Sequence, residues 1–80
     1  MNCQIDTPAT LGQALRQARK DLGLTQPQLA LASGVGVRFI VDLESGKPTI
    51  QLGRTLQVID ALGAELIFTD GADADDHQPR

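Results

Sequence analysis

The sequence predicts an all-α fold, a compact bundle of four to five short helices followed by one short C-terminal strand. Apolar residues recur at the helical spacing of three and four, threonines stand where two of the helical runs begin, and glycines stand where the runs end. Eighty residues are enough for one small domain. With two Phe and no Trp or Tyr, the core must consist mainly of Leu, Ile, Val and Ala.

The first helix is expected from Pro8 to about Leu22. Thr7 serves as its cap, and Pro8 occupies the first helical position, where a missing N–H is harmless. The inward face of this helix is expected to carry Leu11, Leu15, Ala18 and Leu22. Residues 1–6 show no pattern and are expected to form a flexible arm, followed by a domain over residues 7–63.

The stretch from Thr25 to Lys47 predicts two short helices joined by a tight turn. The Thr25 hydroxyl can accept from the backbone N–H of Gln28, whose side chain reaches back, so the pair forms a capping box. Gly34 suits a left-handed turn that lets the chain reverse. Ala30 is the small residue that is needed where two steeply crossing helices approach each other.

The second of these helices is expected to begin near Gly36 and to end at Gly46. Ile40 and Leu43 give it an apolar side that locks the crossing angle. Its outer face carries Val37, Arg38, Val41, Asp42 and Ser45. This order of cap, small residue, glycine and apolar side is typical of a helix-turn-helix, which places its second helix in the DNA major groove.

At these residues the chain resembles the Xre and phage-repressor type of helix-turn-helix domain, over about residues 8–69. The matching run is LGQALRQARKDLGLTQPQLALASGVGVRFIVDLESGKPT. Within that family the segment RFIVDLESGKPT, followed by LQVIDALGAELIF, is most similar to HipB-like antitoxin regulators. The resemblance implies a recognition helix that contacts bases and a C-terminal strand that pairs with its copy in a dimer.

The resemblance places the base-contacting positions on Gly36, Val37, Arg38 and Asp42. The fork of Arg38 can bond O6 and N7 of guanine, although a phosphate contact stays open, and Val37 can touch only thymine methyls. Asp42 could accept from cytosine N4 or hold Arg38 in place. Gly36 stands where relatives often carry Ser or Thr, which removes a cap and a side-chain contact and favours a readout partly dependent on DNA shape.

Three further residues are candidate phosphate contacts. Gln26 lies in the first turn of its helix, where backbone N–H groups also face an anion, and Lys47 lies in a loop beside the groove. Arg54, in the first turn of the next helix, is unfavourable for the helix dipole, so a nearby phosphate would compensate for it. For Gln26 and Lys47 the alternative is a plain solvated residue. The resemblance implies that Arg19 is structural and pairs with Glu44.

The last helix is expected from about residue 52 to 62. Its inward face is expected to carry Leu52, Leu56, Ile59 and Leu62, with Val58 beside them. Residues 64–69 are rich in β-formers and predict a dimerisation strand, because one strand alone leaves its backbone groups unpaired. Its dimerising side chains are Leu66, Ile67 and Phe68. The alternative is a fifth short helix or a tail packed on its own domain.

Charge is divided unevenly along the chain. The net charge is −3, and residues 70–80, with four Asp and one Arg, account for all of it, so residues 1–69 are balanced. The C-terminal segment has no periodicity and is expected to be a disordered acidic tail. A balanced domain can still bind DNA if its few cations share one face, because phosphate contacts are local.

The sequence therefore predicts a cytoplasmic, dimeric repressor that binds double-stranded DNA at a palindromic operator. The resemblance adds an antitoxin role, with a HipA-like kinase toxin as partner. The alternatives are a stand-alone Xre-type regulator and an interaction domain that has lost DNA binding. No cofactor, metal site or membrane span is expected. An enzyme is disfavoured because no nucleophile, base and orienting group form a set.

Overall fold

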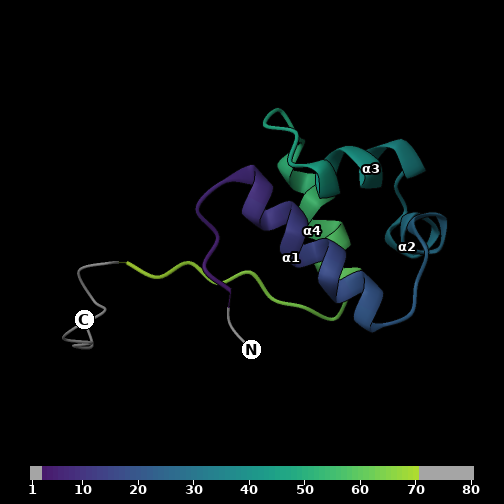
Figure 1. Cartoon of the computed structure of the whole chain (residues 1–80), viewed down its shortest axis with the longest axis horizontal. Helices are drawn as coiled ribbons and strands as arrows, with labels where there is room; N and C mark the ends of the chain where they lie inside the picture. The colour runs from purple at the N-terminus through teal and green to yellow at the C-terminus, as the bar shows by residue number, and fades with distance from the viewer. Residues whose placement is uncertain (1–2, 71–80) are drawn as a thin grey trace.

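The computed structural model describes residues 3–70 and shows four helices there, connected by short turns (Figure 1). They are α1 (Pro8–Asp21), α2 (Gln26–Ser33), α3 (Val37–Ser45) and α4 (Leu52–Ala61). Helix α3 packs against α1 and α2, and α2 also packs against α4. The all-α class and the helix-turn-helix formed by α2 and α3 are therefore confirmed.

Local sequence signals set the helix ends as predicted. Thr7 caps α1. The Thr25 hydroxyl accepts from the backbone N–H of Gln28 at 3.2 Å, and the Gln28 side chain accepts from the Thr25 N–H at 2.9 Å. Gly34 and Gly46 close α2 and α3 with φ of 75° and 87°, the left-handed region that glycine enters without steric cost. The capping box and the glycine turn are thus confirmed.

The core between the helices is aliphatic. Its buried apolar members are Leu15, Leu29, Ala30, Ile40, Leu43, Val58, Ile59 and Leu62. Ala30 is 3% exposed, in keeping with the close helix approach predicted for it. Thr55 is also fully buried, and its hydroxyl donates to the Gln51 carbonyl at 2.8 Å, which satisfies the buried donor.

The predicted inward face of α1 is wrong at its C-terminal end. Leu22 is 56% exposed, because α1 ends at Asp21 and the chain turns at Gly23. The side chain of Leu22 therefore no longer continues the buried face of the helix. Leu24, just beyond the turn, packs against the core instead.

The predicted inward face of α4 is wrong in its first half. Leu52 and Leu56 are 62% and 44% exposed, whereas Thr55 and Val58 are fully buried. The residues that follow the i, i+3, i+4, i+7 pattern of one buried face are Thr55, Val58, Ile59 and Leu62. The prediction failed at Thr55 because a threonine whose hydroxyl bonds its own helix backbone can be buried at little cost.

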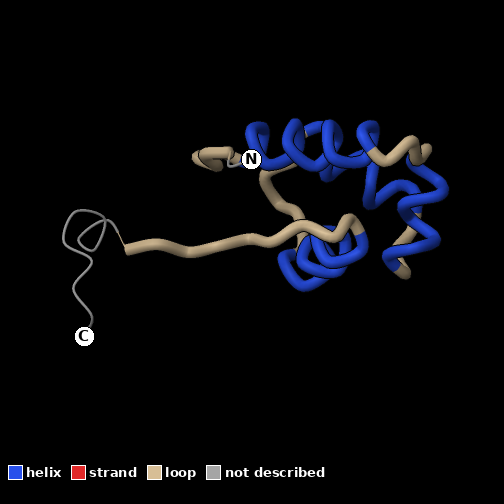
Figure 2. Tube along the Cα trace, turned by 90° about the horizontal axis from the view of Figure 1, so that it is seen from below, coloured by secondary structure: helices blue, strands red, loops and turns tan. Residues whose placement is uncertain are grey.

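Beyond α4 the chain runs away from the helices (Figure 2). Residues 64–70 contain neither helix nor strand, so the strand predicted over 64–69 is absent from the single chain, and no fifth helix replaces it there. The predicted arm, residues 1–6, is described from residue 3 and has no helix or strand before α1. The acidic tail predicted over residues 70–80 lies outside the described residues, except for Asp70. Within the described part of the chain, no helix is long and apolar enough to cross a membrane.

Gly12 brings α1 against α3, and the sequence does not predict this contact. A Cβ at this position would lie 2.5 Å from the carbonyl oxygen of Leu43 and 2.8 Å from that of Glu44. Both are backbone atoms of α3, so no side-chain rotation could relieve the contact. The only signal in the sequence is a glycine within a helical run, which lowers helix stability unless packing requires it.

Gly12→Ala is expected to destabilise the fold by about 1–3 kcal/mol, because the added methyl overpacks a backbone contact. Gly53→Ala is the matched control, since Gly53 also lies in a helix but a Cβ there meets nothing within 4 Å. The control should stabilise the fold by about 0.5–1 kcal/mol through helix propensity. Urea unfolding followed by circular dichroism measures both. Equal effects of the two alanines would show that α1 and α3 are not in close contact at Gly12.

Candidate nucleic-acid interface

Helix α3 is the candidate recognition helix, and its two sides differ as predicted. Ile40 and Leu43 are 0% and 3% exposed against the core. On the other side the Arg38 side chain is 84% exposed, and Val37 is 42% exposed. Packing of the apolar side therefore turns Arg38 outward, which is the condition for contacting a duplex.

Gly36 is the N-cap of α3 and provides no side-chain hydrogen bond, as expected from the missing Ser or Thr. Its carbonyl accepts from the N–H groups of Phe39 and Ile40 at 3.1 and 3.4 Å, which closes the first turn. The first N–H groups of a helix have no partner within that helix. This end of α3 therefore offers backbone donors, rather than a side chain, to an approaching phosphate.

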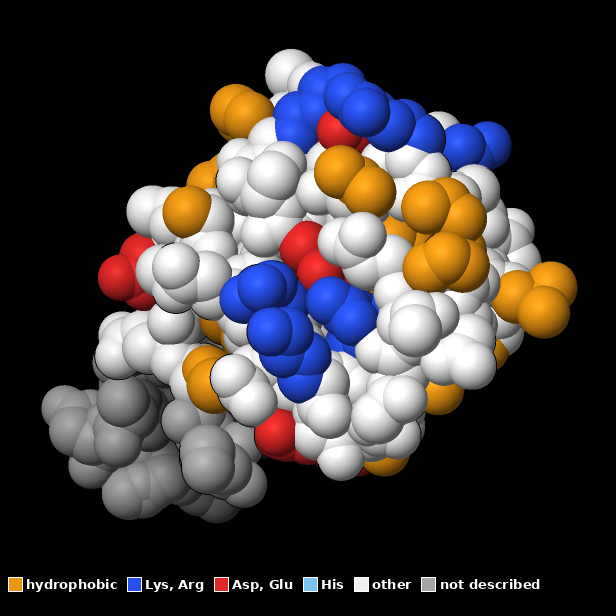
Figure 3. Space-filling model, turned by 45° about the vertical axis from the view of Figure 1, so that its right-hand side comes forward, with side chains coloured by type: hydrophobic (Ala, Val, Ile, Leu, Met, Phe, Trp, Pro, Cys, Tyr) orange, Lys and Arg blue, Asp and Glu red, His pale blue; other side chains and the backbone are white. Residues whose placement is uncertain are grey.

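Asp42 joins two cations on this surface, Arg38 and Lys47. Its Oδ1 lies 3.3 Å from the Arg38 Nε, and its Oδ2 lies 3.6 Å from the Lys47 Nζ in the loop after α3. We call these three residues the α3 charge cluster. Figure 3 shows Lys and Arg side chains in two groups on this face, one along an edge and one near the middle, each with a carboxylate beside it. The contact with Arg38 is one of the two roles that the sequence leaves open for Asp42, and the contact with Lys47 is not predicted.

A buried ion pair fixes the end of α3 to α1. Arg19 donates through Nε to Glu44 Oε2 at 2.7 Å and through Nη2 to Oε1 at 3.0 Å, and through Nη1 to the Leu24 carbonyl at 2.7 Å. The Arg19 and Glu44 side chains are 10% and 4% exposed. The pair implied by the family resemblance is therefore present.

The environment of Arg19 favours its charged form. The hydrogen bond to Glu44 raises the pKa of Arg19 above its ordinary value against the opposing effect of burial, and the negative charge of Glu44 adds to the rise. A cation with a raised pKa contributes its full stabilisation at every pH below its ordinary pKa and loses it only above the raised one. Arg19 therefore keeps its charge through the whole neutral and acid range.

Gln26 is engaged within the protein. Its Nε2 donates to Glu44 Oε1 at 3.1 Å, and the residue is half-buried. A side-chain amide carries two hydrogens, so one of them and the first N–H groups of α2 can still face a phosphate. Nothing in the sequence indicates the bond to Glu44, because the two residues are 18 positions apart.

Arg54 lies exposed in the first turn of α4, and none of the ion pairs among residues 3–70 involves it. It can meet a phosphate, but the structure does not join it to the α3 charge cluster. Over the same residues, no group of three or more His, Cys, Asp and Glu side chains could hold a metal ion.

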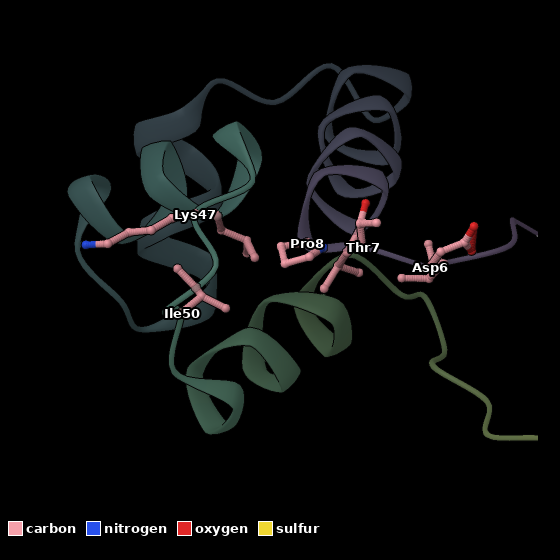
Figure 4. Close-up of a pocket in the computed structure, with 8 residues that line it drawn as sticks. Asp6, Thr7, Pro8, Lys47 and Ile50 are labelled. Atoms are coloured by element: carbon pink, nitrogen blue, oxygen red, sulfur yellow. The ribbon is translucent and has the colours of Figure 1, made fainter.

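A small hollow of about 260 Å³ lies between the start of α1 and the loop after α3 (Figure 4). Thr7 and Pro8 line it on one side, and Ile50 lines it on the other. Lys47 borders the hollow, but its ammonium group points away from Pro8 and Ile50. The charged end of Lys47 therefore belongs to the α3 charge cluster and not to the hollow.

An outward-facing helix, held against a shorter helix by a left-handed glycine turn, defines a helix-turn-helix domain. A family model described as a helix-turn-helix domain matches residues 10–66. The chain is also 52% identical over 63 residues to the uncharacterized HTH-type transcriptional regulator y4mF of Sinorhizobium fredii (strain NBRC 101917 / NGR234), a match that covers 79% of this chain and 83% of that protein. The chain belongs to the Xre-like helix-turn-helix family.

Solved structures share the fold. A chain in the HipA-HipB-O2-O3 complex superposes with a TM-score of 0.79 at 23% identity, covering 86% of this chain and 97% of that one. At this identity the likeness shows the fold alone. The restriction-modification controller protein C.AhdI from Aeromonas hydrophila superposes with a TM-score of 0.66 at 33% identity, covering 72% of this chain and 84% of its own.

Removing one partner of the Arg19–Glu44 pair is expected to cost about 3–5 kcal/mol of unfolding free energy, because the other charge stays buried and unpaired. Arg19→Met and Glu44→Met test the two sides, and the double variant should lose clearly less than their sum. Arg16→Met is the control, since Arg16 is exposed on the same helix, and it should change stability by less than about 0.5 kcal/mol. Denaturant unfolding measures all four variants. Strictly additive losses would mean that the two side chains are not coupled.

Proposed function

We propose that this protein is a dimeric repressor that binds a palindromic DNA operator. The observation that carries the proposal is the outward placement of Arg38 on α3, whose opposite side is locked into the core by Ile40 and Leu43. A helix fixed in this way can enter the major groove with its N-terminal half facing the base edges. Membership of the helix-turn-helix family supports the same partner.

Base contacts are assigned to α3 and phosphate contacts to its surroundings. Arg38 can bond O6 and N7 of guanine, Val37 can contact a thymine methyl, and the missing side chain at Gly36 allows close backbone approach. Asp42 lies on the same helix face and either accepts from cytosine N4 or acts on Arg38. The proposed phosphate contacts are Gln26, Lys47 and Arg54.

The open C-terminal segment supports the dimer. Leu66, Ile67 and Phe68 are 50%, 69% and 93% exposed. The segment lines a groove of about 1060 Å³ together with residues of α1 and residues 3–5. Pairing of this segment with its copy would cover part of these side chains and give the facing backbone edge of each strand its hydrogen-bond partners. The two α3 helices of such a dimer would meet half-sites about 34–36 Å apart.

An antitoxin role, with a HipA-like kinase as protein partner, is the finer part of the proposal. It is supported by the fold shared with a chain of the HipA-HipB-O2-O3 complex and by the resemblance of the segment RFIVDLESGKPT to HipB-like regulators. Co-purification with the product of an adjacent kinase-like gene tests it. If no such product binds, the alternative is a stand-alone regulator. The similarity to an HTH-type transcriptional regulator supports that alternative.

Arg38→Ala and Lys47→Ala are expected to have different effects on operator DNA and on random DNA. Arg38→Ala removes a base contact worth about 1–3 kcal/mol, so it should weaken operator binding by about 5- to 150-fold and random duplexes little. Lys47→Ala removes a phosphate contact from each protomer, so it should weaken all duplexes alike and flatten the salt dependence of log K by about one unit per protomer. Fluorescence anisotropy with operator and random duplexes over a salt series measures both.

Lys20→Ala is the control for these two variants, because Lys20 is exposed on α1 and is assigned no DNA contact. It should leave both affinities unchanged. Equal losses on operator and random DNA for Arg38→Ala would make Arg38 a backbone contact. Absence of any binding to its own promoter by the wild type at low ionic strength would end the DNA-binding proposal.

Phe68→Asp is expected to weaken dimerisation by at least about tenfold, because burying a Phe side chain contributes about 1.5–3 kcal/mol and the dimer contains two copies. The fold of one chain should be unaffected, since Phe68 is 93% exposed there. Leu31→Asp is the matched control, because Leu31 is an 85% exposed apolar residue on α2, away from this segment. Sedimentation equilibrium gives the two dimer constants. Equal constants would remove residues 64–69 from the dimer interface.

A further inference from the structure

We propose, on the basis of the function proposed above, that Asp42 is a positioning residue that determines specificity. Its carboxylate holds Arg38 for a guanine and competes with phosphates for both Arg38 and Lys47. Two ion pairs place this carboxylate between the cations, at 3.3 Å from the Arg38 Nε and 3.6 Å from the Lys47 Nζ. Without it, both cations would be free to take any phosphate they met.

The carboxylate approaches Arg38 from its inner nitrogen. The ion pair places Oδ1 3.3 Å from Nε, and the Arg38 side chain is 84% exposed, so its terminal nitrogens can reach a base from the open side. The terminal edge of a guanidinium is well placed to bond O6 and N7 of guanine together. The Asp42 side chain is 21% exposed, against 84% for Arg38. The surrounding protein therefore restricts the position of the carboxylate more than that of the guanidinium. An arginine held at Nε has less side-chain freedom to lose when it meets a base.

The backbone fixes Lys47 beside the same carboxylate. The Lys47 N–H donates to the Asp42 carbonyl oxygen at 3.1 Å, across the left-handed turn at Gly46. Gly46 is itself pressed against α1, since a Cβ there would lie 2.9 Å from the Ala9 Cα. The loop is therefore held from two sides. The backbone of Lys47 stays close to Asp42 in every conformation of the Lys47 side chain.

A carboxylate at this place alters the balance between specific and non-specific binding. Non-specific affinity grows with the number of cations that phosphates can reach. Asp42 cancels one of the two positive charges of Arg38 and Lys47, and it also repels phosphates directly. A guanine, in contrast, is bonded by the terminal nitrogens of Arg38 while Nε stays paired. Asp42 therefore lowers the affinity for all sequences, and lowers it least for a site with guanine opposite Arg38.

The test compares the full wild-type chain with Asp42→Asn and Asp42→Ala. The probes are a site that the wild type selects from a pool of random duplexes and an unselected duplex of equal length. Asp60→Asn is the control, because Asp60 is an exposed carboxylate on α4, outside the α3 charge cluster, and is assigned no DNA contact. Thermal unfolding of each variant shows that the fold is retained.

Both Asp42 variants should bind the unselected duplex about three- to tenfold more tightly, with a salt dependence steeper by about one unit per protomer. The ratio of selected-site to unselected affinity should fall by about threefold or more, and Asp60→Asn should leave it unchanged. Replacing the contacted guanine by 7-deazaguanine, which lacks N7, should weaken the wild type more than either variant. A purely structural role for Asp42 would not produce that difference.

An unchanged affinity ratio and salt dependence in both Asp42 variants would overturn the proposal. A loss of affinity confined to a base pair other than the one that Arg38 contacts would overturn it as well, by making Asp42 a direct contact to cytosine. If the wild type selects no site from the pool, the proposed function itself fails. The two failures are therefore distinguishable.

Discussion

The bidentate ion pair between Arg19 and Glu44 is the interaction on which the arrangement of the helices depends. The Glu44 carboxylate accepts from Arg19 on α1 and from Gln26 on α2, and Glu44 itself lies in the last turn of α3. One buried side chain therefore joins three helices. Because a buried ion pair rarely exceeds an apolar pair in stability, we attribute to it the choice of one helix orientation rather than the bulk of the folding energy.

A backbone contact nearer the start of α1 complements the ion pair. Gly12 and Arg19 are both buried on α1 and lie seven residues apart, which is about two turns, or about 10 Å along the axis. Gly12 meets the Glu44 carbonyl, and Arg19 meets the Glu44 carboxylate. The end of α3 is thus held at two points along α1, which fixes the distance between the helices and the rotation of α3. That rotation sets the direction in which Arg38 points.

The features that the sequence predicts correctly are local. Thr25 and Gly34 act through a hydrogen bond and a backbone angle within a few residues, so residue type alone is enough to place the helix ends. Burial on α4 depends on where α2 packs, and neither the polarity of Thr55 nor the hydrophobicity of Leu52 contains that information. The bond from Gln26 to α3 joins residues distant in the sequence, and the buried ion pair is anticipated only through the family resemblance. A C-terminal strand needs a second backbone, which one chain does not supply.

On the proposed function, the distribution of charge links DNA binding to dimerisation. Six of the seven basic residues precede residue 70, but Arg19 is neutralised by Glu44, and Asp42 is shared by Arg38 and Lys47. Residues 3–70 of one protomer therefore offer few cations outside these ion pairs, and one protomer should hold a half-site weakly. Two joined protomers make the second half-site contact intramolecular, at a high effective concentration. Occupancy of the operator then requires a dimer and a site where both α3 helices contact their bases. The C-terminal segment that forms the dimer is therefore as necessary to recognition as α3.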